Sequence, residues 1–122
     1  MLEHVLGKAL YEAVDEAFTA LGSSSRILLL GYLEREHSIT LERIPNRLDA
    51  VTESLELLLG QNGKSLSKLI AKHLYRKVGL DFPARDDWDL VQYVEDARSK
   101  LERTQGILIS NLLKSKQETV SI

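Results

Sequence analysis

The chain has 122 residues, a formal net charge of −2 and no cysteine. This length is typical of one domain with a core large enough to do without disulfide or metal staples. The lack of cysteine excludes a disulfide framework and any thiolate metal site, and it is compatible with a reducing cytoplasm.

The first predicted helix covers about residues 2–21, where one broad face is apolar. Its apolar residues recur at helical spacing: Leu2, Val5, Leu6, Ala9, Leu10, Ala13, Val14, Ala17, Phe18 and Leu21. Gly22 ends this helix, and Ser23 to Ser25 offer N-caps for a second helix that runs to about Glu36. The second helix contains Ile27 to Leu33 (ILLLGYL), which is apolar on all sides, so we expect it at the centre of the core.

Neither segment predicts a membrane protein. The run from Ile27 to Leu33 is far shorter than the roughly 20 residues that cross a bilayer. The N-terminal stretch MLEHVLGKALYEAVDEA carries acids where a secretory signal needs an apolar core. We therefore expect a cytoplasmic protein without a membrane partner.

After the second helix, the sequence predicts a short helical turn and then a third helix. Thr40 precedes LERI, a one-turn helix that Pro45 should stop. Asn46 can cap the helix that is expected from Arg47 to Leu59. Only the segment from Ser38 to Leu41 (SITL) could be extended, and one such segment cannot form a sheet.

The stretch LLLGQNGKSLSKLI, residues 57–70, contains part of the phosphate-loop pattern G-x-x-x-x-G-K-[ST]. The position of the first glycine holds Leu58, and the preceding apolar run has the spacing of a helix, whereas a phosphate loop follows a strand. We therefore expect no nucleotide site here. Instead, Gly60 should cap the third helix, Gln61 to Gly63 should form a turn, and a fourth helix should run from Lys64 to Val78.

A long last helix is expected from about Asp86 to Ser115, because Asp86 and Asp87 suit the positive N-terminal end of a helix dipole. Its apolar residues form a narrow stripe: Trp88, Val91, Val94, Ala97, Leu101, Leu108 and Leu112. Five of them fit a loose heptad: Val91, Val94, Leu101, Leu108 and Leu112. This arm could pair with its twin in a homodimer or fold back over the other helices, and the sequence leaves both alternatives open. The predicted fold class is all-α, a compact bundle of five or six helices, with residues 1–82 as the compact domain and residues 83–122 as a long C-terminal arm.

Charge is unevenly distributed along the chain. The net charge is −5 for residues 1–59, +4 for residues 60–83 and −1 for residues 84–122. The positive segment contains five cations on one predicted helix, which we call the basic ridge: Lys64, Lys68, Lys72, Arg76 and Lys77. A spacing of four places the first four of them on one side of the helix, opposite the apolar side. We predict that the basic ridge is the surface that binds a partner.

Three partners could neutralise the basic ridge. One is the acidic side of the first helix of the same chain, with Glu12, Asp15 and Glu16. Another is nucleic acid, whose phosphates bind clustered lysine and arginine without a base-reading motif. The third is an acidic protein surface, toward which a basic helix supplies steering and specificity. The sequence alone does not choose among them.

No catalytic constellation is visible in the sequence. The only histidines are His4, His37 and His73, and they occur without an H-E-x-x-H motif or another paired metal-ligand spacing. His4 lies off the apolar stripe, His37 ends a polar helix tail, and His73 is expected at the edge of the core. We therefore predict that the protein is not an enzyme and needs no metal or cofactor.

A set of packing and turn residues recurs along about residues 2–82: Leu10, Tyr11, Leu21, Gly22, Leu33, Ile44, Pro45, Gly60, Leu74, Tyr75, Gly79 and Leu80. This pattern resembles a small archaeal family of helical domains, the Nitrosopumilus-type output domains. The resemblance implies a non-catalytic module of archaeal signalling, and it carries over no catalytic residue. The function that we predict is a signalling output or protein-interaction domain. The alternative is a non-specific nucleic-acid-binding regulator that uses residues 64–78.

Overall fold

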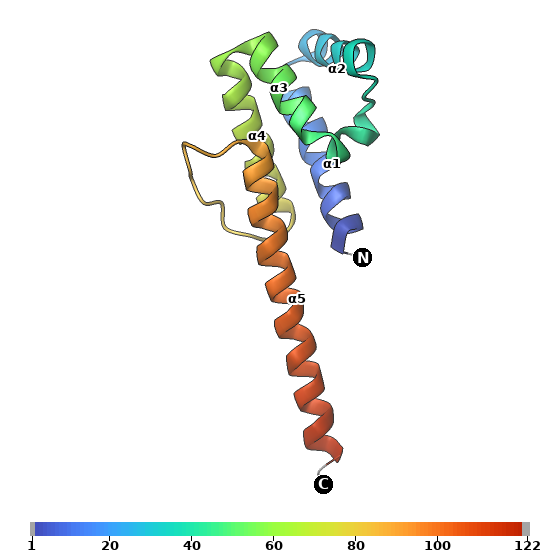
Figure 1. The fold of residues 1–122 in the computed structure, drawn as a ribbon, viewed down its shortest axis with the longest axis vertical. Helices are drawn as coiled ribbons and strands as arrows, with labels where there is room; N and C mark the ends of the chain where they lie inside the picture. The colour runs from blue at the N-terminus through green and yellow to red at the C-terminus, as the bar shows by residue number, and fades with distance from the viewer. Residues whose placement is uncertain (1, 121–122) are drawn as a thin grey trace.

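The structure of the protein is an all-α bundle, as predicted. It is a computed structural model that describes the backbone of residues 2–120 and the side chains of residues 2–106. Its helices are α1 (Leu2–Ala20), α2 (Ser23–His37), the 3₁₀ helix η1 (Leu41–Asn46), α3 (Leu48–Leu59), α4 (Gln61–Lys77) and α5 (Leu90–Val120). The described backbone contains no strand. Figure 1 shows α1, α3 and α4 together in the body of the molecule and α5 extending beyond it.

The core forms where α1, α3 and α4 meet. The apolar side of α1 is buried from Leu6 to Phe18, in agreement with its helical stripe, whereas Val5 and Leu21 near the ends of the stripe are exposed. α4 packs against both α1 and α3. It buries one side of its own: Leu66, Ile70, Ala71, Leu74 and Tyr75. Each fully buried leucine or isoleucine stabilises the fold by about 1.5–3 kcal/mol relative to an exposed one.

The prediction that the apolar segment of α2 lies at the centre of the core is wrong. Only Leu29 and Leu33 of α2 are buried, whereas Ile27 and Leu28 are 68% and 69% exposed. Figure 1 shows α2 at the edge of the body, and its contacts are with α1 and α3. An apolar segment carries no information about which neighbours will cover it, and no described element covers the outer side of α2.

α3 and α4 form a helical hairpin joined by Gly60 alone. Gly60 has a φ of 59° and a ψ of −128°, a conformation that side-chain-bearing residues rarely adopt. The expected turn from Gln61 to Gly63 is wrong, since α4 already begins at Gln61. Gly63 is a packing residue, because a Cβ atom there would collide with the backbone carbonyl of Leu55 on α3. The two helices therefore approach at Gly63 more closely than a side chain would allow.

The segment between α2 and α3 differs in detail from the prediction. Pro45 does not stop the short helix, because η1 continues through it to Asn46. Arg47 precedes α3 in place of the predicted Asn46 cap, and no side-chain hydrogen bond caps that helix. η1 packs against α1 with Ile44 fully buried, so tertiary contact fixes this segment where a local cap was expected.

α5 begins at Leu90, later than the predicted Asp86. Asp89 and Gln92 form a capping box at its start: Gln92 N donates to Asp89 Oδ1 at 2.9 Å, and Asp89 N donates to Gln92 Oε1 at 2.8 Å. This D-x-x-Q pair satisfies two backbone N–H groups that would otherwise lack partners. Asp86 and Asp87 belong to the preceding loop.

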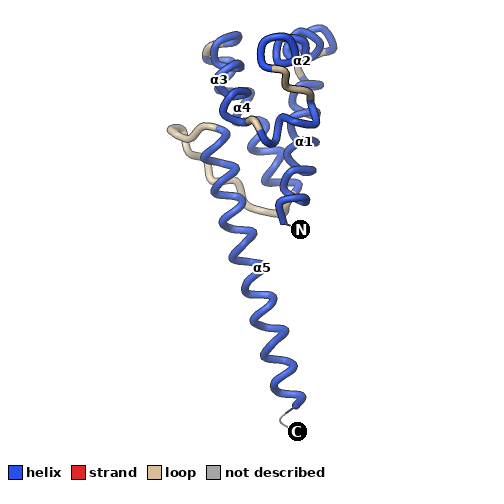
Figure 2. Tube along the Cα trace, turned by 45° about the vertical axis from the view of Figure 1, so that its right-hand side comes forward, coloured by secondary structure: helices blue, strands red, loops and turns tan. Residues whose placement is uncertain are grey.

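The first part of α5 belongs to the core, and the rest leaves the body. Its buried side chains join the same cluster as those of α1, α3 and α4: Leu90, Tyr93, Val94 and Ala97. Residues 102–106 are exposed, and Figure 2 shows α5 running on alone from there. The heptad positions Leu108 and Leu112 lie outside the residues whose side chains are described. Neither α5 nor any other helix in the described backbone is apolar enough over a sufficient length to cross a membrane.

Gly63→Ala tests the close approach of α3 and α4. We expect the free energy of unfolding to fall by about 1–3 kcal/mol, because the added Cβ must push α4 away from Leu55. Gly7→Ala is the matched control, since no atom of the fold lies within 4 Å of its added Cβ and alanine should stabilise α1 by up to about 1 kcal/mol. Urea unfolding followed by circular dichroism measures both changes. Equal effects of the two substitutions would contradict this account.

Candidate functional site: the basic ridge and an adjoining polar pocket

The basic ridge lies on the outer side of α4, and its five members have different surroundings. Lys64, Lys72 and Arg76 are exposed, whereas Lys68 and Lys77 are half-buried. The opposite side of α4 is the one buried in the core. What each cation can bind therefore depends on the neighbours that the fold brings to it.

Lys77 faces α1 and is neutralised within the chain. Its Nζ lies 2.5 Å from Glu16 Oε1 and 3.6 Å from Glu12 Oε2. The hydrogen bond between Lys77 and Glu16 raises the pKa of Lys77 and lowers the pKa of Glu16. Asp15, the third acid on this side of α1, pairs instead with Arg26 at 2.6 Å. The acidic side of α1 thus accounts for one cation of the basic ridge.

The loop between α4 and α5 covers the middle of the basic ridge. Lys68 Nζ donates a hydrogen bond to Asp86 Oδ1 at 3.1 Å, and Lys72 Nζ lies 5.8 Å from the centre of the Phe82 ring. Phe82 is held in turn by stacking on Tyr93, with 4.9 Å between the ring centres. The loop therefore provides a carboxylate that binds Lys68 and an aromatic ring that contacts Lys72.

Three members of the basic ridge, Lys64, Lys72 and Arg76, have no carboxylate within 4 Å among the described side chains. His73 Nδ1 lies 2.6 Å from Arg76 Nη2. His73 Nδ1 also lies 2.9 Å from Glu16 Oε2. This nitrogen can accept from Arg76 only without a proton and donate to Glu16 only with one. His73 thus lies at the contact between α1 and α4, and it is half-buried, in agreement with its predicted place at the edge of the core.

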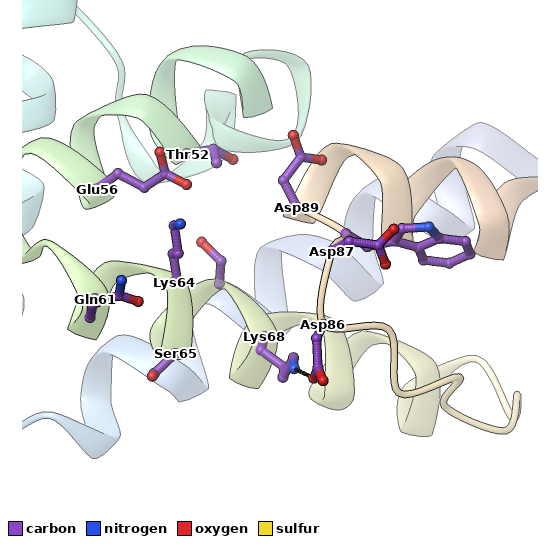
Figure 3. Close-up of a pocket in the computed structure, with 11 residues that line it drawn as sticks. Thr52, Glu56, Gln61, Lys64, Ser65, Lys68, Asp86, Asp87 and Asp89 are labelled. Atoms are coloured by element: carbon purple, nitrogen blue, oxygen red, sulfur yellow. Dashed lines mark hydrogen bonds and ion pairs between the residues drawn. The ribbon is translucent and has the colours of Figure 1, made fainter.

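One end of the basic ridge opens into a polar pocket between α3, α4 and the loop before α5 (Figure 3). Its volume is about 410 Å³, within the range of about 300–1,000 Å³ that is typical of small-molecule sites. Its charged lining residues come from three places: Lys64 and Lys68 from α4, Glu56 from α3, and Asp86, Asp87 and Asp89 from the loop. In Figure 3, Lys64 projects from α4 toward Glu56 and Thr52.

Two hydroxyl groups in the lining of the polar pocket are buried without a hydrogen-bond partner. Thr52 and Ser67 are 7% and 5% exposed, and among the described side chains only their hydroxyl oxygens are buried and unpartnered. An unpartnered buried hydroxyl costs about 1–3 kcal/mol. Ser54, also buried on α3, shows the ordinary arrangement, because its hydroxyl donates to Ala50 O at 2.8 Å.

A buried tyrosine fixes α4 to α5. The hydroxyl of Tyr75 lies 2.5 Å from Asp96 Oδ2 and 2.8 Å from Tyr93 O, two acceptors that share its single proton. Burial and the hydrogen bond to Asp96 raise the pKa of Tyr75 far above its usual value. Burial by itself would raise the pKa of Asp96, but the hydrogen bonds from Tyr75 and Lys100 outweigh it and the pKa is lowered. These groups hold the two helices in register and leave no free nucleophile or base.

Sequence reasoning missed the polar pocket and the Tyr75 contact. It placed Lys64 on a ridge, but the acids around it come from another helix and a loop. No local pattern links Thr52 to Ser67, or Tyr75 to Asp96. One signal was available, because Thr52 and Ser67 are polar residues on the sides of α3 and α4 that the helical period assigns to the core.

The described residues contain no group of three or more His, Cys, Asp or Glu side chains placed to hold a metal ion. His4 is exposed, and His37 is half-buried with its ring 5.9 Å from that of Tyr32. Comparisons with protein-family models, curated proteins and solved structures gave no match.

The fold should lose stability in acid. The pKa values of Asp96, Glu3 and Glu16 are lowered in the folded chain, so their stabilising contribution is present above the unfolded-state pKa and is lost as the pH falls through the folded-state value. We expect the free energy of unfolding, measured with urea, to decrease from about pH 5 to about pH 3. Asp96→Asn should make this decrease shallower, and Glu53→Gln, at an exposed site in the middle of α3, should not. An unchanged slope for Asp96→Asn would contradict the lowered pKa.

Proposed function

We propose that this chain is a non-catalytic protein-interaction domain whose contact surface lies on α2 and α3. A group of exposed apolar side chains carries this proposal: Leu21, Ile27, Leu28, Leu57 and Leu58. The most exposed of them, Leu57, is 74% exposed. Proteins rarely expose large apolar side chains in a group, and such groups mark sites of interaction with other molecules.

Three of these side chains, Leu21, Leu28 and Leu58, line an apolar groove between α2 and α3. The groove has a volume of about 500 Å³. Its apolar lining is formed by six residues: Leu21, Leu28, Leu29, Tyr32, Leu58 and Leu59. Arg35 is the one charged residue in the lining that the structure describes, and none of the described carboxylates pairs with it. Its guanidinium lies back over Gly31, where an added Cβ would be only 2.9 Å from Nη1.

An amphipathic helix that carries a carboxylate is the partner that fits this groove. A groove between two helices receives the apolar face of a third helix through side chains spaced by three or four residues. A carboxylate on that helix would form a charge-assisted, two-pronged hydrogen bond with the unpaired guanidinium of Arg35. A role for this contact in archaeal signalling is supported by the family resemblance alone.

Selection from a phage-displayed library of helical peptides tests the proposal. We expect the enriched peptides to carry apolar residues at helical spacing and at least one acid. Leu28→Ser and Leu58→Ser should each weaken peptide binding by about tenfold or more, because each removes an apolar anchor from the groove. Val5→Ser is the matched control, since Val5 is 50% exposed on α1 but does not line the groove. Fluorescence anisotropy of labelled peptides gives the affinities.

Enriched peptides without an apolar face, or an equal loss of binding in Val5→Ser, would contradict the groove as the contact surface. Sedimentation velocity of the chain alone separates the self-association alternatives. A dimer that Leu28→Ser dissociates would assign the groove to a second copy of the chain. A dimer that only Leu108→Asp and Leu112→Asp dissociate would favour the alternative of a homodimer through the C-terminal helix and leave the groove free.

Non-specific nucleic-acid binding through α4 is the second candidate function. One observation favours it: Lys64, Lys72 and Arg76 lie along one side of α4 without described carboxylate partners. Phosphate contacts by so few cations would be weak, because the affinity and its salt dependence both grow with the number of contacts. The carboxylates on Lys68 and Lys77 reduce the positive field further, which makes this candidate the weaker one.

Anisotropy of labelled duplex and single-stranded DNA at about 50 mM and about 200 mM salt distinguishes the two functions. We expect no saturable binding at tens of micromolar protein, because two of the five cations are already paired with carboxylates. Binding that weakens steeply with salt and is lost in a Lys64→Glu, Lys72→Glu double variant would favour the nucleic-acid function. Lys8→Glu, at an exposed site on α1, is the control for a general charge effect.

A further inference from the structure

We propose that the polar pocket between α3, α4 and the loop before α5 binds a small zwitterion of the amino-acid class. The carboxylate of the ligand meets Lys64, and its ammonium group meets Glu56 and Asp89. This inference does not rest on the protein-interaction role, because the pocket and the apolar groove have different lining residues.

Unpaired charges of opposite sign enter the pocket from different elements. Lys64 projects from α4 toward α3, and no described carboxylate lies within ion-pair distance of it (Figure 3). Glu56 enters from α3 and has no described ion-pair partner, while Asp89 lies at the start of α5. Asp89 uses Oδ1 in the capping box, which leaves Oδ2 without a protein donor. A pocket lined by unpaired charges of both signs complements a ligand that carries both.

The two unpartnered hydroxyls are a second and independent indication of a ligand. Thr52 on α3 and Ser67 on α4 are both more than nine-tenths buried, both line the pocket, and neither hydroxyl has a hydrogen-bond partner. A hydroxyl can donate to a carboxylate and accept from an ammonium group. A zwitterion whose ends reached these two hydroxyls would give each of them a hydrogen-bond partner.

The balance of charge narrows the class of ligand. Lys68 and Asp86 neutralise each other at 3.1 Å. The remaining charged lining residues are one lysine and three acids: Lys64, Glu56, Asp87 and Asp89. A net negative pocket repels phosphate and other simple anions. It favours a zwitterion with a second cationic group, such as lysine or arginine, over glutamate. Its carboxylates are not among any described group placed to hold a metal ion.

Fluorescence of Trp88 provides a direct test. Trp88 is the only tryptophan of the chain and it lines the pocket, so a bound ligand changes its surroundings. We expect a saturable change with L-lysine and L-arginine, and affinity lower by about tenfold or more for L-glutamate. Cadaverine has the two amines of lysine without the carboxylate. Cadaverine should also bind about tenfold more weakly than L-lysine, because it offers no carboxylate to Lys64.

Two variants that each remove one charge locate the two ends of the ligand. Lys64→Met should weaken L-lysine binding by about tenfold without weakening cadaverine binding, because only L-lysine has a carboxylate. Glu56→Gln should weaken the binding of both ligands. Lys8→Met and Glu53→Gln are matched controls at exposed sites outside the pocket and should change neither affinity.

The proposal is overturned if the fluorescence of Trp88 does not change with L-lysine up to about 10 mM, a concentration far above the dissociation constant expected of a specific site. Inorganic phosphate that binds as well as L-lysine would overturn it too, because the site would then be an anion site. Equal affinities for cadaverine and L-lysine would overturn the role of Lys64. Each of these outcomes leaves peptide binding at the apolar groove untouched, so the failure of one proposal is distinguishable from the failure of the other.

Discussion

The packing of α4 against α1 and α3 is the contact on which the rest of the structure depends. α4 buries one continuous side in that contact, and Gly63 lets its backbone approach α3 without an intervening side chain. The same helix holds α5 through the hydroxyl of Tyr75, which reaches both Tyr93 and Asp96. Because three neighbouring helices are positioned by α4, the outer side of α4 is also the place where their charged residues meet its cations.

This central position explains why the basic ridge is not a uniform charged surface. Lys77 lies next to α1 and is neutralised by Glu16, whereas Lys68 lies under the loop before α5 and is neutralised by Asp86. Lys64 is left at the end of the helix, where α3 and the loop form a pocket around it (Figure 3). Five cations that look equivalent in the sequence thus differ in what they can bind.

α3 contributes side chains to both candidate surfaces of the molecule. Near its C-terminal end, Glu56 lines the polar pocket, while Leu58 and Leu59 line the apolar groove. Leu58 lies about 200° from Glu56 around the helix axis, whereas Leu59 lies only about 60° from it, so the two surfaces adjoin at this end of α3. The apolar groove exists because α2 lies at the edge of the body with Ile27 and Leu28 uncovered.

The sequence by itself determined the all-α class, the approximate helix positions and the buried side of α1, because the 3.6-residue period acts within each helix. Only the tertiary structure decided that α2 lies at the edge, that Gly63 is a packing contact and that Lys77 finds a carboxylate on α1. The polar pocket likewise joins a helix, its neighbour and a loop. These features depend on residues far apart in the chain, and the period of one helix carries no information about which neighbour will cover it.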